Sequence, residues 1–68
     1  MIIGLNGSRT ELPAGATLAD AIAAAGADSD LRGVAAAVAG EVVPQPRWEE
    51  WRLHEGEEVE VVRAVQGG

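Results

Sequence analysis

The length of the chain, 68 residues, is the feature that most restricts what it can fold into. A chain of this size forms one small domain around one core, and it is too short to enclose a substrate cleft of roughly several hundred cubic ångströms. The sequence contains no cysteine, so disulfides cannot supplement that core. We therefore expect a carrier, adaptor or binding module and not a free-standing enzyme.

The charge balance narrows the choice of partners. Eleven acidic against five basic side chains give a net charge of −6. This charge disfavours binding to nucleic acid or an anionic membrane and allows a basic protein partner. The start of the chain, Met1–Gly7, has neither a basic segment nor a long apolar run, so we expect a cytoplasmic protein, monomeric when free.

Asn6-Gly7 predicts a β-hairpin at the start of the chain. This dipeptide favours a two-residue turn, and it lies between the apolar Ile2–Leu5 and the alternating Ser8–Leu12. Pro13 cannot donate a ladder hydrogen bond, so the second strand should end before it.

The only strong helical pattern follows this hairpin. Thr17 has the character of an N-cap, and Asp20 three residues later completes a variant of the capping box. Leu18, Ile22 and Ala25 share one face, and Gly26 should end the helix. A helix of about nine residues is marginal alone, so it must pack on a sheet.

The second half of the chain reads as strands joined by turns. Val34–Val38 is rich in alanine but short and bounded by glycines, which predicts a strand, and a brief strand follows at Glu41–Val43. Trp48–Trp51 fits one helical turn, and Glu58–Val65 is the last strand. The fold class is α+β, with a mixed sheet of four to five strands packed on one main helix. The first and last strands should be central neighbours, and residues 1–65 should form a single domain.

The side chains show no catalytic group and no metal site. The acidic pairs Glu49/Glu50 and Glu57/Glu58 are sequence neighbours, which do not face each other on a helix or strand. His54 is the only histidine and cannot hold a metal ion alone. We expect these residues on the solvated surface.

The end of the chain has a different character. The last strand leads directly into Gln66, Gly67 and Gly68. Glycines lack side chains and adopt unusual dihedral angles, so this segment could enter a narrow channel and present an unhindered carboxylate. We expect residues 66–68 to be a flexible tail that delivers the Gly68 carboxylate into the active site of another protein. The alternative is a frayed end that happens to be glycine.

The sequence resembles the ThiS family of thiamine-biosynthesis sulfur carriers over nearly its whole length. Four stretches carry the resemblance: Asn6-Gly7, Pro13–Asp20, Gly40–Pro44 with Trp48 behind it, and the ending Val62–Gly68. It departs from the family at Ala39, where asparagine is more common, and at Gln66, where the family more often has an additional small residue. The terminal Gly-Gly is intact.

The resemblance implies a ubiquitin-like β-grasp fold and a carrier function without catalysis. A ThiF-type partner would use ATP and Mg²⁺ to adenylate the Gly68 carboxylate. A persulfide from a cysteine desulfurase or another donor would convert it to a thiocarboxylate, which would donate sulfur to a ThiG-type thiazole synthase. The carrier itself would bind no cofactor.

The last strand also suggests where the partner docks. If Val59 and Val61 face the helix, Val62 and Ala64 face outward beside Glu60, and together they form an apolar patch with an acidic rim. The alternative is an ordinary solvated strand face.

Two other functions remain open from the sequence. One is the same chemistry in another pathway, as in the small subunit of molybdopterin synthase, a family that is usually longer and richer in aromatic residues near its tail. The other is a non-catalytic β-grasp interaction domain in which the Gly-Gly is incidental.

Overall fold

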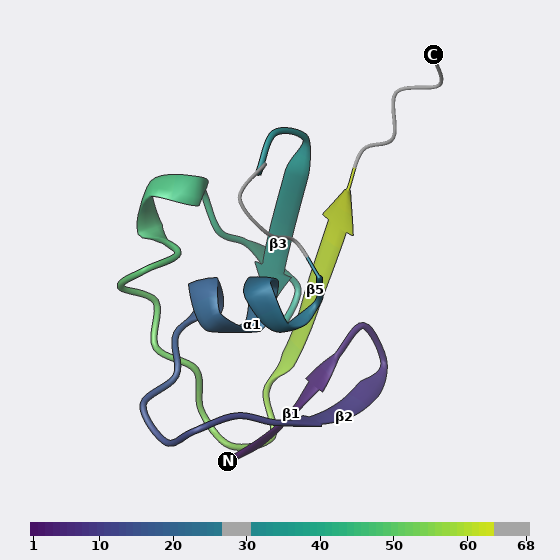
Figure 1. The fold of residues 1–68 in the computed structure, drawn as a ribbon, viewed down its shortest axis with the longest axis vertical. Helices are drawn as coiled ribbons and strands as arrows, with labels where there is room; N and C mark the ends of the chain where they lie inside the picture. Colours follow the sequence, from purple (N-terminus) through teal and green to yellow (C-terminus); the bar gives the residue numbers. More distant parts are fainter. Residues whose placement is uncertain (27–30, 64–68) are drawn as a thin grey trace.

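The computed structural model describes residues 1–26 and 31–63, which form one sheet and one α-helix (Figure 1). The sheet has five strands in the order β2-β1-β5-β3-β4. The elements, in chain order, are β1 (Ile2–Leu5), β2 (Ser8–Glu11), α1 (Leu18–Ala24), β3 (Val34–Val38), β4 (Glu41–Val42), the 3₁₀ turn η1 (Gln45–Arg47) and β5 (Glu58–Arg63).

The last strand lies at the centre of the sheet. β5 pairs in parallel with β1 and antiparallel with β3, while β2 and β4 form the two edges. The predicted α+β class, the mixed sheet on one helix and the central pairing of the first and last strands are therefore confirmed. The predicted domain boundary between residues 65 and 66 lies outside the described residues.

The first hairpin turns at the predicted dipeptide. Asn6 and Gly7 both have positive φ, 51° and 81°, as a type I′ turn requires. The return strand ends at Glu11, one residue earlier than predicted, although the Leu12 N–H still donates to the Met1 carbonyl at 2.9 Å.

Helix α1 starts at the predicted cap and ends sooner than predicted. The Asp20 carboxylate accepts a hydrogen bond from the Thr17 backbone N–H at 2.9 Å. Leu18 and Ile22 are buried as predicted, but the prediction for Ala25 is wrong: it is exposed, and Ala21 is buried instead. The reason is that α1 ends at Ala24 and Ala25 is its C-cap, with φ −79° and ψ 0°, so Ala25 lies at the open end of the helix and not on its buried face.

The alanine-rich segment forms strand β3, as predicted. Its five residues pair with β5 from Val34↔Arg63 to Val38↔Val59. Alanine favours helix locally, so this long pairing outweighs the local preference. Ala36 and Val38 face the core and are buried.

The helical turn near the tryptophans is misplaced in the prediction. The turn is 3₁₀ and spans Gln45–Arg47, whereas Trp48–Trp51 was expected to form it. Pro46 fits the first positions of such a turn, because those positions need no N–H donor. Trp48 follows the turn and is buried, and its indole N–H donates to the Val43 carbonyl at 2.7 Å.

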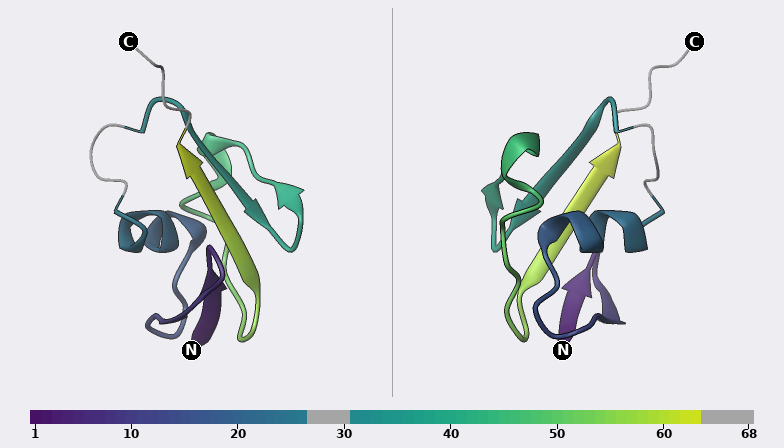
Figure 2. Two further views of the ribbon diagram at one scale, coloured as in Figure 1. Left: turned by 90° about the vertical axis from the view of Figure 1, so that its right-hand side faces the viewer. Right: turned by 60° about the vertical axis from the view of Figure 1, so that its left-hand side comes forward.

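One core holds these elements together. Helix α1 crosses one face of the sheet, as the two views of Figure 2 show. Backbone hydrogen bonds tie its start to the tryptophan segment, from the Leu18 N–H to the Trp51 carbonyl at 2.8 Å and from the Ala19 N–H to the Trp48 carbonyl at 3.1 Å. The largest fully buried side chains are Ile3, Leu18, Ile22, Val43 and Val59.

Candidate functional site

Strand β5 divides its side chains between the core and the opposite face of the sheet. Val59 is fully buried and Val61 is half-buried, while Glu60 and Val62 are exposed. This alternation follows from the two-residue period of a strand and confirms the predicted outward direction of Glu60 and Val62. Val62 has 60% of its surface exposed, which is high for a large aliphatic side chain in a central strand.

Neighbouring strands extend this exposed apolar face beyond the residues singled out from the sequence. Val42 on β4 is 72% exposed, and the outward residues Ala35 and Ala37 of β3 lie between β4 and β5. The register pairs Ala35 with Val62, and it pairs Ala37 with both Glu60 and Val42. We call these five residues the outer patch: Ala35, Ala37, Val42, Glu60 and Val62.

The outer patch contains a depression of about 130 Å³ lined mainly by apolar side chains. The short alanine side chains of β3 lie between Val42 on β4 and Val62 on β5, because β3 is the middle strand of the three. Sequence reasoning missed Val42, Ala35 and Ala37. The alternation within 34–38 could have placed the two alanines on the outward face, but only the strand order places them beside Val62.

The other predicted site residues lie at or beyond the end of the described chain. Ala64, Gln66, Gly67 and Gly68 are outside the described residues, so the structure neither places the predicted tail nor brings Ala64 to the outer patch. The last described residue of β5 is Arg63, which pairs with Val34.

The neighbouring turn of the first hairpin contributes to the position of β5. The Asn6 N–H donates to the Val59 carbonyl at 2.9 Å, and the Val61 N–H donates to the Asn6 Oδ1 at 2.8 Å. The Asn6 side chain therefore continues the pairing of β1 with β5 beyond the last ladder pair, Leu5↔Val59.

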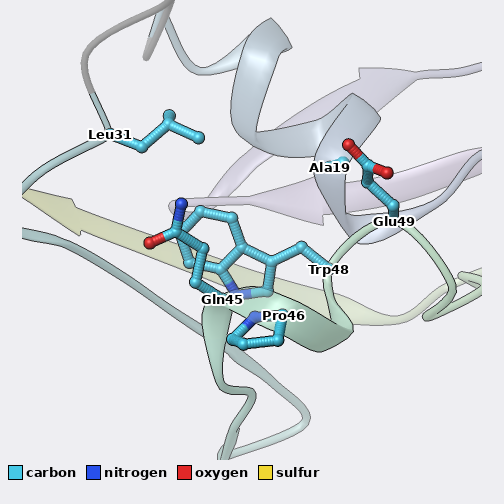
Figure 3. Close-up of a pocket in the computed structure, with 6 residues that line it drawn as sticks. All are labelled: Ala19, Leu31, Gln45, Pro46, Trp48 and Glu49. Carbon is cyan, nitrogen blue, oxygen red and sulfur yellow. The ribbon is translucent and has the colours of Figure 1, made fainter.

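A larger surface pocket, about 410 Å³, lies between α1 and η1 (Figure 3). Glu49 is the one ionisable residue among those that line it, so this pocket holds no acid–base pair. Trp48 forms part of its wall, with its indole N–H already satisfied by Val43. The lining residues are Ala19, Leu31, Gln45, Pro46, Trp48 and Glu49.

Of the residues predicted to lie on the solvated surface, all but one are exposed, and the exception is the half-buried Glu57. His54 is exposed, and its Nδ1 lies 3.6 Å from the Glu57 Oε1, which also accepts the His54 backbone N–H at 2.7 Å. Over residues 1–26 and 31–63, no three His, Cys, Asp or Glu side chains group as a metal site. Within the same described residues, no helix is long and apolar enough to span a membrane.

In the described part of the chain, the strand order and the one α-helix that crosses the sheet define a small domain of the ubiquitin-like β-grasp class. Comparison with known proteins agrees with this class. The crystal structure of the thiamine biosynthesis protein ThiS from Geobacter metallireducens superposes with a TM-score of 0.78 at 18% identity, and the match covers all of both chains. This likeness shows the shared fold.

The family follows from the sequence match. The model of the ThiS family matches residues 3–68, so the chain belongs to the ThiS family. No curated protein sequence matches it.

Proposed function

We propose that this protein is the sulfur carrier of thiamine biosynthesis and that the Gly68 carboxylate is the group that carries the sulfur. The observation that supports this most directly is the family match, which extends through the final Gly67-Gly68. The structural likeness to a protein named for thiamine biosynthesis adds support. In this proposal the chain is a substrate of enzymes and performs no catalysis itself.

The first step is activation of the carboxylate. A free carboxylate is a poor electrophile. In the active site of a ThiF-type enzyme, a Gly68 oxygen attacks the α-phosphorus of Mg²⁺-bound ATP, and pyrophosphate leaves. The resulting acyl-adenylate has AMP as a good leaving group. Because this step uses ATP, we propose that it takes place in the cytoplasm.

The second step exchanges oxygen for sulfur. The terminal sulfur of a persulfide, supplied by a cysteine desulfurase or another donor, forms a bond to the carbonyl carbon as AMP leaves. A thiol then reduces the remaining S–S bond and releases the thiocarboxylate, which donates its sulfur to a ThiG-type thiazole synthase. The chain contains no cysteine of its own, so no internal thiol competes for the activated carbonyl.

The outer patch supports a docking role for the strand that leads to the tail. Val62 and Glu60 lie on the same face of β5 that ends at Arg63, five residues before Gly68. An extended segment of that length spans on the order of 15 Å, enough to reach into a partner while the patch rests on its surface. The predicted docking residue Ala64 belongs to this segment.

Mass spectrometry of the intact protein tests the proposal. The free monomer is incubated with ATP, Mg²⁺, the adenylating enzyme of the same organism and a persulfide donor. We expect the mass to rise by the difference between a sulfur and an oxygen atom, and a variant that lacks Gly68 should show no change. If the chain that ends in Gly68 keeps its mass, the carrier function is wrong and a plain interaction domain is favoured.

A further inference from the structure

The outer patch is concave and not flat. Ala35 and Ala37 are the outward residues of β3, and each is paired across the sheet with a larger outward residue. Because cross-strand partners lie about 5 Å apart, Val42 and Val62 rise beside the two methyl groups. The result is the depression of about 130 Å³ described above.

The size and lining of the depression indicate what fits it. A cavity of about 150 Å³ lined by aliphatic side chains accommodates one benzene molecule. The depression offers a similar volume, although it is open to solvent on its outer side, and Glu60 is the one charged residue among those that line it. One large apolar side chain therefore matches it in volume and polarity, whereas a polar metabolite would leave its hydrogen-bonding groups unsatisfied.

Charge decides between a second copy of this chain and a different partner. Glu58 and Glu60 lie on the outward face of β5, in line with Val62, and the chain has a net charge of −6. A second copy would set like charges against each other at short distance. A partner with a basic residue beside its apolar side chain would instead pair with Glu60.

We propose that the depression between Val42 and Val62 receives one large apolar side chain of the adenylating enzyme, and that a basic residue beside that side chain pairs with Glu60. This inference rests on the proposed function and specifies how the partner recognises the carrier. The alanines at 35 and 37 are then specificity residues, because their small size creates the space.

Filling the depression tests the inference. Ala35→Leu adds apolar surface but occupies the space, so the partner side chain can no longer enter. We expect the Kd for the adenylating enzyme, measured by titration calorimetry, to rise roughly tenfold or more. In ATP–pyrophosphate exchange the KM for the carrier should rise similarly while kcat stays unchanged, because the substitution lies far along the chain from the reacting Gly68.

Three further variants keep the outcome interpretable. Ala14→Leu makes the same addition at an exposed loop residue and should bind like the natural chain. Ala35→Val adds less volume, and valine favours strand structure. It therefore tests the role of the depression even if Ala35→Leu lowers the thermal stability of the protein. Glu60→Gln should weaken binding and reduce its dependence on salt.

The possible results distinguish a failure of the carrier function from a failure of the proposed role of the depression. If the natural chain is adenylated and both Ala35 variants, folded by circular dichroism, bind as tightly as it does, the depression has no such role and the carrier function stands. If the natural chain neither binds nor is adenylated, the proposed function and this inference both fail.

Discussion

At the scale of the residue, Asn6 performs two separate structural tasks. Its positive φ of 51° shapes the first hairpin, and its side-chain Oδ1 accepts the Val61 N–H at 2.8 Å. The first task is predictable, because asparagine tolerates left-handed backbone. The second is not, because Val61 is 55 residues away and only the folded sheet brings it near.

A pair of substitutions separates these two tasks. Asn6→Gly keeps the backbone conformation and removes the acceptor, so the free energy of unfolding should fall by about 1 kcal/mol. Asn6→Ala also places alanine at positive φ, which adds about 1 kcal/mol to the loss. Urea unfolding followed by the fluorescence of the buried Trp48 measures both. Equal stability of the two variants would show that the turn conformation contributes nothing.

At the scale of the element, the hairpin of β3 and β4 contains a residue poorly suited to its position. Ala39 and Gly40 form the two-residue turn with φ of 51° and 82°. Glycine adopts this conformation freely, but in alanine the Cβ comes close to the following carbonyl oxygen, which raises the free energy of the turn. The departure from the family at Ala39 therefore destabilises this turn.

We therefore predict that Ala39→Asn stabilises the protein. Asparagine reaches positive φ at lower cost than alanine, so the free energy of unfolding should rise by up to about 1 kcal/mol. The thermal midpoint followed by circular dichroism is a suitable measurement. Ala23→Asn, on the exposed side of α1, is the control and should lower the midpoint, because asparagine is a weaker helix former than alanine. A lower midpoint for Ala39→Asn would contradict the prediction.

Local signals predicted some elements well and others poorly. The hairpin turn at Asn6-Gly7 and the cap at Thr17 involve residues close in sequence, so the dipeptide and the capping box were sufficient. The helix end at Ala24 and the 3₁₀ turn at Gln45–Arg47 were misjudged. Both lie where the chain must turn to meet other elements, and that requirement is absent from a local pattern.

At the scale of the whole molecule, the net charge of −6 should govern how the carrier meets its partner. We predict that the association rate with the adenylating enzyme falls at least about tenfold when the salt concentration rises from about 0.05 M to about 0.5 M, because added ions screen long-range attraction. The dissociation rate should change much less, since it depends on the packed outer patch. Stopped-flow measurements of both rates provide the test.

The control for this prediction removes one acidic group away from the patch. Glu11→Gln, on the edge strand β2, changes the net charge by one unit, as Glu60→Gln does. Both should reduce the association rate slightly, but Glu60→Gln alone should also speed dissociation. An association rate that is insensitive to salt would show that the acidic charge has no steering role.

The sequence by itself determined the local conformations and the face on which each strand residue lies. The Asn6-Gly7 turn, the start of α1, the strand character of Val34–Val38 and the outward direction of Glu60 and Val62 follow from turn chemistry, capping and the two-residue period of strands. Only the tertiary structure decided that Ala35 lies beside Val62 and that Ala37 lies beside Val42. The physical reason is that strand order and register depend on how the whole sheet covers α1, so the depression arises from residues that no local pattern connects.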